Sequence, residues 1–318
     1  MKEIGGYIEL DTYYLPMPHE KAIALNCGRN ALAYVLRARR IKKIKIPYFL
    51  CDSVSNVCKR ENVEVSYYHI GLDFRFSTID LQDDEWLYIV NYYGQITNEE
   101  IKQYAHVYKR VIVDQSQAYF QMPVEGIDTL YTCRKWFGVA DGAFLYTDAT
   151  INEELPLDKS YDRMRFLLGR YEGNASDFYS EYSENNMLFA NEPIKRMSKL
   201  TKNLLHGIDY KTAEEKRKEN FRLVHEKLGG HNQIQVKLSS FMYPFMIENG
   251  SVIRRELQKQ KIYIPILWPS VFDVVSEESN EFKMAENILP LPIDQRYVEA
   301  DMKYMIDILL STIHMNNT

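Results

Sequence analysis

The stretches VIVDQSQAYF at residues 111–120 and LYTCRKWFGVADGAFLYT at residues 130–147 decide how we expect this chain to fold. The apolar run VIVD predicts a buried strand whose last residue is Asp114, and AFLY at residues 143–146 predicts a second strand. Lys135 lies between these strands, followed by a turn that contains glycine and aspartate. Asp114 is therefore expected at the carboxyl end of a strand, with Lys135 in a later loop.

An acid at a strand end and a lysine between two strands suit the cofactor pyridoxal phosphate (PLP). A lysine amine forms a Schiff base with this cofactor, and a carboxylate holds the pyridinium nitrogen protonated so that the ring accepts electrons. Lys135 and Asp114 are the candidates for these roles, and Arg134 could help to lower the pKa of the lysine. Taken singly, Lys135 would be a surface lysine and Asp114 a turn or helix cap.

The composition describes a folded, weakly acidic chain. Its 318 residues are 46% hydrophobic and carry a net charge of -5, which permits a large core and argues against nucleic acid as the main partner. The scattered histidines and cysteines lack metal-ligand spacing, so no metal is expected. No segment has the apolar length of a signal peptide core or a membrane span. We expect reduced thiols, no membrane partner and a cytoplasmic location.

The first half of the chain alternates between strand and helix patterns. This alternation predicts an α/β fold with a mostly parallel sheet covered by helices on both faces, and ligands beyond the carboxyl ends of its strands. Gly28, Tyr48, Tyr93 and Asp114 all follow or end expected strands. The expected strands are 22–25, 45–47, 63–68, 86–90 and 111–114, and the expected helices are 31–40, 53–60 and 98–108.

The second half predicts a smaller α+β unit. Residues 148–190 are polar and indicate only weak helices, whereas stronger helices are expected at 193–208, 211–228, 251–260 and 299–314. Strand-like runs occur at 235–238, 241–247 and 263–266. We place a boundary near residue 210, with a large domain at 1–210 and a small domain at 211–318. Residues 1–20 are expected to form an irregular arm that could cross a dimer interface.

A candidate anion site lies where the first expected strand turns into a helix. Backbone N–H groups and the helix dipole at Gly28, Arg29 and Asn30 would meet a phosphate, and Thr132, three residues before Lys135, could join them. An ordinary strand–helix turn is the competing interpretation. For Thr132, an ordinary structural role in a turn explains the sequence as well as a phosphate contact does.

Several motifs together resemble the DegT/StrS-like sugar aminotransferases, a branch of the fold-type I PLP-dependent enzymes. NCGRNAL resembles the family's phosphate turn, VNYYGQ resembles Val-His-Leu-Tyr-Gly, and VDQSQA resembles the segment that holds the pyridine acid. Lys135 with its following turn resembles the Schiff-base lysine and its Gly-Glu-Gly-Gly. The resemblance covers nearly the whole chain, through residues 26–32, 90–95, 113–118, 135–142, 285–293 and 297–309.

The resemblance implies a homodimeric aminotransferase with PLP on Lys135. Asp114 would contact the pyridine nitrogen, and Gln117 would contact the ring or its 3′-oxygen. The implied substrates are an amino donor such as glutamate and a keto-sugar acceptor that is linked to a nucleotide. A ring-stacking residue is expected within 48–51. Tyr93 and Trp268 are candidate substrate contacts, although packing is the more common role of such residues.

The chain also departs from the family pattern. Cys27 replaces the serine of the phosphate turn, the segment between Lys135 and residue 190 is short, and the cross-dimer Asn-x-Arg motif is unclear near Arg196. Two alternatives stay open. One is a PLP lyase or dehydratase, because the fold hosts many chemistries, although the family's dehydratases replace the lysine with histidine. The other is a non-catalytic or regulatory protein that retains the fold.

Overall fold

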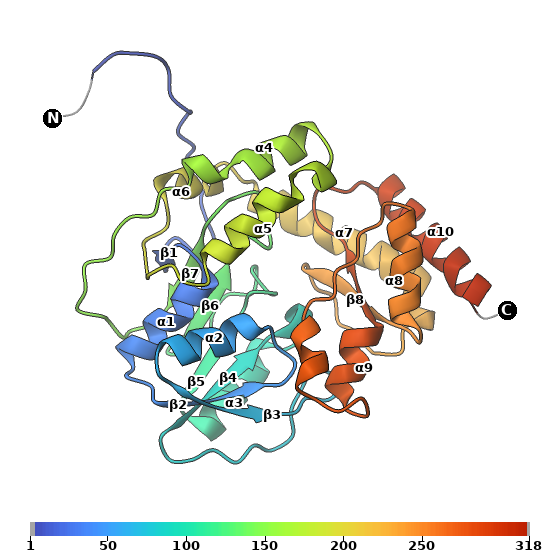
Figure 1. Cartoon of the computed structure of the whole chain (residues 1–318), viewed down its shortest axis with the longest axis horizontal. Helices are drawn as coiled ribbons and strands as arrows, with labels where there is room; N and C mark the ends of the chain where they lie inside the picture. The colour runs from blue at the N-terminus through green and yellow to red at the C-terminus, as the bar shows by residue number, and fades with distance from the viewer. Residues whose placement is uncertain (1–3, 317–318) are drawn as a thin grey trace.

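A seven-stranded sheet forms the centre of the computed structural model, which describes residues 4–316 (Figure 1). Its strand order is β1-β7-β6-β5-β4-β2-β3. The strands β2 to β6 run parallel to one another, whereas β7 is antiparallel to both β6 and β1. The mostly parallel sheet is therefore confirmed. The strands are β1 (Ile23–Leu25), β2 (Lys43–Pro47), β3 (Glu64–Tyr68), β4 (Glu85–Val90), β5 (Val111–Asp114), β6 (Asp128–Thr132) and β7 (Ala143–Tyr146).

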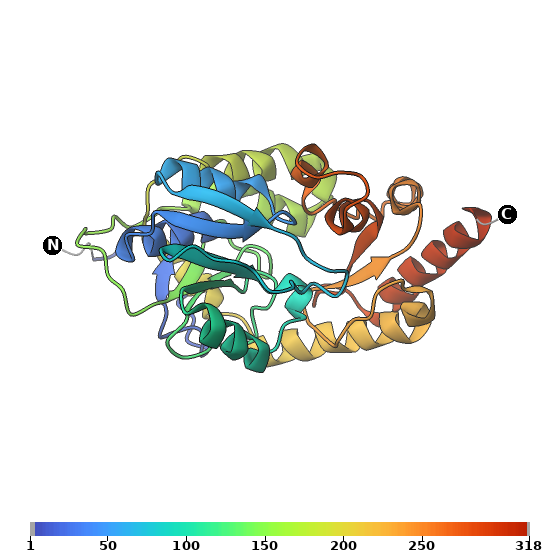
Figure 2. The same cartoon turned by 90° about the horizontal axis from the view of Figure 1, so that it is seen from below.

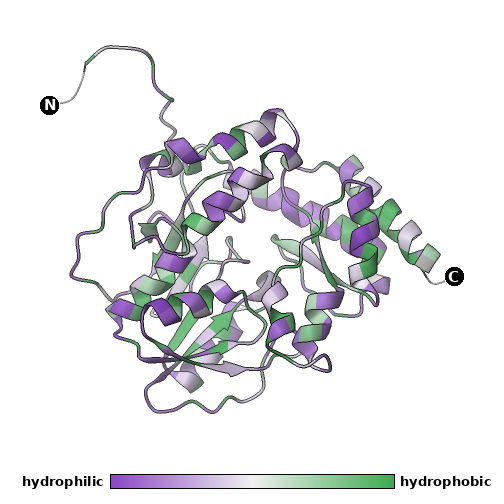
Figure 3. Cartoon of the chain, in the orientation of Figure 1, coloured by the Kyte–Doolittle hydropathy of each residue, from purple (hydrophilic) through white to green (hydrophobic). Residues whose placement is uncertain are grey.

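Helices cover both faces of this sheet. Figure 2 shows α1 (Gly28–Ala38) and α2 (Asp52–Arg60) on one face and α3 (Asn98–Tyr108) on the other. All four residues of β5 are buried, because a central parallel strand has helices on both sides. The central strands accordingly carry mostly the hydrophobic colour in Figure 3, whereas the helices combine hydrophobic and hydrophilic residues. α3 begins at Thr97 with a capping box, in which Thr97 and Glu100 bond to each other's backbone.

A second, two-stranded antiparallel sheet lies at the C-terminal side of the molecule. Its strands are β8 (Met242–Met246) and β9 (Ile288–Pro292), and α7 and α10 pack on its apolar side chains. The helices of this half are α7 (Tyr210–Leu228), α8 (Gly250–Lys259), α9 (Asn280–Asn287) and α10 (Glu299–Asn316). Between the two sheets the chain forms α4 (Arg165–Glu172), α5 (Tyr179–Leu188) and α6 (Lys199–Leu205). The boundary near residue 210 stays a prediction.

Three expectations for the second half are wrong. Residues 235–238 form no strand, because the backbone of Lys237 bonds to the side chain of Gln95 instead of to another strand. Residues 263–266 form no strand either, since Pro265 lacks an N–H donor. The helix expected at 193–208 begins only at Lys199, because Arg196 pairs with the backbone of Pro156 and Asp158 in an extended conformation.

Two of the strands and one of the helices were not predicted from the sequence. β6 has five residues and follows a turn, β9 has five residues and follows α9 directly, and α9 is only eight residues long. No helix within residues 4–316 is long and apolar enough to cross a membrane.

Candidate active site

Asp114 is held rigidly at the carboxyl end of β5. The hydroxyl of Tyr88 on neighbouring β4 donates to its Oδ2 at 2.8 Å, and the N–H of Ser116 donates to its Oδ1 at 2.7 Å. Burial, followed by the Asp114 charge, raises the pKa of Tyr88, so this hydroxyl remains a donor. Asp114 is only 8% exposed. Its carboxylate is a fixed acceptor with lone pairs left for one further cationic donor.

Gln117 and Tyr93 form one rigid unit beside Asp114. Tyr93 has a positive φ of 51° and donates its N–H to Oε1 of Gln117 at 2.7 Å. This bond leaves Nε2 of Gln117 as the free end of the amide, with no hydrogen bond to the described residues. The Tyr93 ring is buried between Phe74, Phe241 and Trp268. Tyr93 therefore packs, and it orients Gln117 through its backbone.

Lys135 is exposed in the loop that joins β6 to β7, and it makes no hydrogen bond or ion pair within residues 4–316. The next residue anchors the loop. Nε1 of Trp136 donates to the carbonyl of Ser116 at 3.0 Å, two residues beyond Asp114. The Trp136 carbonyl accepts from Arg217 and Gln295, each at 3.2 Å. These bonds tie the loop that carries Lys135 to the segment that carries Asp114.

Gly28 and Thr132 touch at the start of α1. A Cβ added to Gly28 would lie 2.7 Å from Cγ2 of Thr132, so only glycine fits here without a shift. The N-cap residue Cys27 gives no side-chain cap, and the first N–H groups of α1, at Gly28 and Arg29, have no intrahelical acceptor. Oγ1 of Thr132 is buried without a partner. Several unsatisfied donors therefore converge at this turn.

Asn30 is already fully engaged within the protein. Its amide Nδ2 donates to Oδ1 of Asn26 and to the carbonyl of Pro193, and its Oδ1 accepts from Arg60. Its backbone N–H bonds to the carbonyl of Cys27. These contacts support a role for Asn30 in shaping the turn, and its direct contact with an anion stays a prediction.

The aromatic residues at 48–51 pack on other rings of the protein, and the ring-stacking role of this segment stays a prediction. Phe49 packs against Trp268 with ring centroids 4.3 Å apart, and Tyr48 stacks on Tyr67 of the edge strand.

Trp268 belongs to an aromatic cluster between the two halves of the chain. Besides Phe49, it contacts the ring of Tyr92 at 5.4 Å, and it is 5% exposed. A small cavity of about 10 Å³ remains beside it. These contacts show packing by Trp268, and its contact with a substrate stays a prediction.

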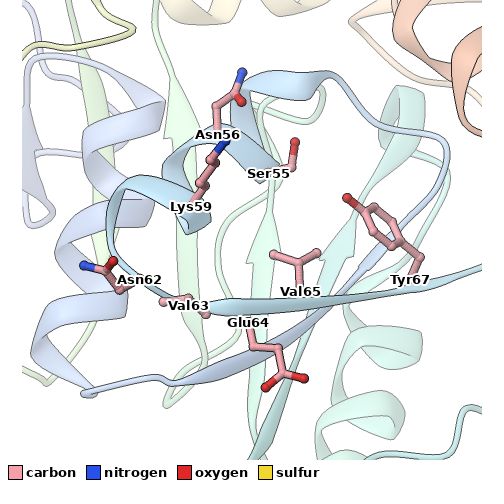
Figure 4. A pocket seen from close by; sticks show the side chains of 8 residues that line it. All are labelled: Ser55, Asn56, Lys59, Asn62, Val63, Glu64, Val65 and Tyr67. Carbon is pink, nitrogen blue, oxygen red and sulfur yellow. The ribbon is translucent and has the colours of Figure 1, made fainter.

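An open cavity lies elsewhere, between α2 and the edge strand β3 (Figure 4). It is an open hollow of about 460 Å³, and neither it nor the small cavity is lined by Asp114, Gln117 or Lys135. No group of three or more potential metal-ligating side chains occurs within residues 4–316. The side chains that line the larger cavity are Ser55, Asn56, Lys59, Asn62, Val63, Glu64, Val65 and Tyr67.

Sequence reasoning missed Tyr88 and Ser116. Tyr88 stood inside the apolar run WLYIV and was assigned to the core, and only the pairing of β4 with β5 brings its hydroxyl to Asp114. A hydroxyl within an otherwise apolar buried strand was the available signal, because a buried tyrosine hydroxyl needs a partner.

Several solved structures with a similar fold are aminotransferases. NtdA from Bacillus subtilis with bound cofactor PMP matches with a TM-score of 0.67 and 15% identity, over 92% of this chain and 73% of that chain. Sugar aminotransferase CalS13 from Micromonospora echinospora matches with a TM-score of 0.63 and 14% identity, over 93% and 88%. A DegT DnrJ EryC1 StrS aminotransferase from Brucella abortus matches with a TM-score of 0.60 and 15% identity, over 91% and 85%.

No protein-family model and no curated protein sequence matches the chain. At identities of 12–15%, the structural likeness establishes the fold. The expected α/β fold of the fold-type I transferases, with its additional C-terminal α+β unit, is confirmed.

Proposed function

We propose that this protein is a PLP-dependent aminotransferase that transfers an amino group from an amino acid such as glutamate to a keto-sugar. The observation that carries the proposal is the joint anchoring of Asp114 and the Lys135 loop. Trp136 bonds to Ser116, and Ser116 bonds to Asp114, so the acid and the lysine belong to one connected structure. This structure lies at the carboxyl edge of a sheet whose fold is shared with aminotransferases.

The residues at this edge fit the chemical groups of PLP. The fixed Asp114 carboxylate suits a protonated pyridine nitrogen, and the free Nε2 of Gln117 suits the ring's 3′-oxygen. The unpartnered Oγ1 of Thr132 and the uncapped start of α1 suit a phosphate. The absence of a Cβ at Gly28 gives space for close approach of that phosphate.

The reaction divides between the cofactor and the protein. PLP, when bound, supplies an electron sink that stabilises negative charge at the α-carbon of an amino donor. Tyr88 and Ser116 both donate to the Asp114 carboxylate and hold it in place, so that it would accept a hydrogen bond from the protonated pyridine nitrogen. Lys135 would move a proton between the donor's α-carbon and the C4′ carbon of the cofactor. Its exposed position leaves the side chain free to turn toward either atom.

The finer parts of the proposal are the acceptor, the assembly and the compartment. CalS13 is a sugar aminotransferase, which supports a keto-sugar acceptor, and we extend this to a nucleotide-linked one. A homodimer and a cytoplasmic location complete the proposal. The four cysteines are free, consistent with a reducing compartment.

An absorbance spectrum of the purified protein with added PLP tests the proposal. We expect a band in the imine region and, after borohydride reduction, a labelled peptide that contains Lys135. Glutamate should then convert the bound cofactor to its pyridoxamine form. Lys135→Arg is the matched variant, because it retains the charge and should abolish the reducible label. A correctly folded protein that shows no band with PLP would refute the proposal.

A non-catalytic role is the second candidate, favoured by the cavities. Neither of the two cavities described above is lined by Asp114, Gln117 or Lys135, and Lys135 forms no hydrogen bond or ion pair within residues 4–316. A protein in this role would fold normally without retaining PLP. A PLP lyase or dehydratase would retain the cofactor but release the amino group as ammonia, which a coupled ammonia assay detects.

A further inference from the structure

Two arginines beside the start of α1 lack a carboxylate partner. Neither Arg29 nor Arg134 forms an ion pair within residues 4–316, whereas their neighbours Arg60 and Arg163 pair with Glu61 and Asp158. Burial lowers the pKa of the Arg134 guanidinium, and its Nε is buried without a hydrogen-bond partner. A shielded cation without a counter-ion is costly, so this position is suited to a bound anion.

Both arginines face the same turn as Thr132. Thr132, the last residue of β6, comes two residues before Arg134, and Arg29 follows Gly28, whose added Cβ would meet Thr132. Arg29 and Arg134 also bond to the same residue of α5, Asn186, so their guanidinium groups lie close together. The two guanidinium groups therefore join Thr132 and the uncapped N–H groups of α1 at one place.

A neutral amide from the end of α5 currently accepts from both arginines. Nη1 of Arg29 donates to the carbonyl of Asn186 at 3.3 Å, and Nη2 of Arg134 donates to Oδ1 of the same residue. The Arg134 guanidinium also lies over the ring of Phe189, 4.8 Å from its centroid. Asn186 thus occupies the acceptor position between two cations without neutralising either charge.

We propose that Arg29 and Arg134, with Thr132, bind the phosphate monoester of the cofactor. In the absence of the cofactor, Asn186 accepts the hydrogen bonds of the two arginines in place of the phosphate. This inference rests on the proposed function for the identity of the ligand. The anion site itself depends only on the donors described above. Arg134, which is adjacent to Lys135, is thereby a phosphate-binding residue, and the end of α5 must yield when the cofactor binds.

The test compares PLP with pyridoxal, which has the same ring without the phosphate, in absorbance titrations of the wild-type protein and Arg134→Gln. Loss of a charge-assisted contact should weaken PLP binding about ten- to hundredfold and leave pyridoxal binding unchanged. Arg163→Gln is the control, because Arg163 lies over the same Phe189 ring, at 5.3 Å, but has its own carboxylate. This control should keep the preference for PLP.

Asn186→Asp provides a variant that does not depend on loss of a cation. An aspartate here would give Arg134 a counter-ion, so the ligand-free protein should melt at a higher temperature while PLP binds at least tenfold more weakly. Equal weakening of PLP and pyridoxal by Arg134→Gln, or unchanged PLP binding in Asn186→Asp, would overturn the inference.

Inorganic phosphate separates this inference from the proposed function. Stabilisation of the wild-type protein by phosphate, lost in Arg134→Gln, supports the anion site even if PLP fails to bind. PLP that binds equally to the wild-type protein and Arg134→Gln supports the function but refutes the role of Arg134. Neither phosphate nor PLP binding to the folded wild-type protein refutes both.

Discussion

Gly28 is the residue whose replacement tests the start of α1 most simply. In Gly28→Ala, the new Cβ would lie 2.7 Å from Cγ2 of Thr132, a β-branched side chain with little rotational freedom. We expect a loss of about 1–3 kcal/mol in the free energy of unfolding and weaker PLP binding. Gly230→Ala is the control, because nothing lies within 4 Å of a Cβ there. Equal urea denaturation midpoints for the two variants would contradict the close contact.

His19 makes stability depend on pH. Burial lowers its pKa from 6.5 to about 4, opposed by its bond to the Tyr119 carbonyl. That bond, at 2.8 Å, requires a proton on Nε2, so Nδ1 accepts from the Tyr146 hydroxyl at 3.2 Å. The rings of Tyr119, Tyr131, Phe144 and Tyr146 surround the imidazole, and no carboxylate forms an ion pair with it in the described chain.

The sign follows from which state binds the proton. Above pH 6.5 both states of His19 are neutral, whereas between pH 6.5 and 4 only the unfolded chain takes up the proton, so stability falls as the pH falls. The His19 contribution to this loss reaches about 3 kcal/mol near pH 4. Urea unfolding between pH 4.5 and 7 should show a shallower pH slope in His19→Gln than in the wild-type protein. Parallel slopes would show that His19 is not the titrating group.

The loop between β6 and β7 depends on an element far away in the sequence. Arg217 of α7 is 2% exposed, and its guanidinium lies 4.6 Å from the ring centroid of Trp136. Its hydrogen bonds go to the carbonyls of Trp136, Ser240 and Phe241 and to Oε1 of Gln295. One side chain of α7 thereby holds both the Lys135 loop and the segment before β8.

Arg217→Met should therefore loosen the Lys135 loop. We expect a loss of about 2–4 kcal/mol in the free energy of unfolding, because the carbonyls around Arg217 would lose their donors. Amide hydrogen exchange should accelerate in the peptide that contains Lys135. Arg222→Met is the matched control, since Arg222 lies exposed on the same helix. Unchanged exchange around Lys135 in a destabilised Arg217→Met protein would limit Arg217 to a general structural role.

Elements could be predicted where the pattern is local and strong. The strand β5 could be predicted because VIVD is an apolar run that ends in an acid. The helix α7 could be predicted because the helical pattern at 211–228 is long. β9 was missed because its sequence ILPLP contains two prolines, which disfavour a strand unless their positions need no donor. The formation of β9 depends on its partner strand β8, which lies more than 40 residues earlier in the sequence.

The candidate site divides in the same way. Asp114 and Gly28 could be placed from the sequence, because a strand end and a strand–helix turn are local features. Tyr88 and Asn186 could not, since their contacts join residues 26 and 52 positions apart and require the tertiary fold. The sequence also could not distinguish Arg134 from a surface arginine, because its missing counter-ion is visible only once its neighbours are known.

At the scale of the whole molecule, the N-terminal arm leaves apolar side chains in water. Figure 1 shows it extending away from the sheet, and residues 4–10 make no hydrogen bond or ion pair with the rest of the described chain. Ile4, Tyr7 and Ile8 are each more than 90% exposed. Burial of these side chains against a second copy would stabilise a dimer by about 25 cal/mol for each Å² of apolar surface removed from water.

Removal of the arm should therefore weaken the dimer without unfolding the chain. We expect a variant that begins at Asp11 to dissociate at protein concentrations at least tenfold higher than the wild-type protein does, measured by sedimentation velocity over a dilution series. Tyr7→Ser with Ile8→Ser should behave alike at full length, and Glu9→Gln is the polar control. Because the contacts of Asp11 and Tyr13 with Asn203 are retained, the truncated chain should keep its circular dichroism spectrum. A wild-type monomer at all concentrations would exclude the homodimer, whereas an equally stable dimer without the arm would place the interface on another surface.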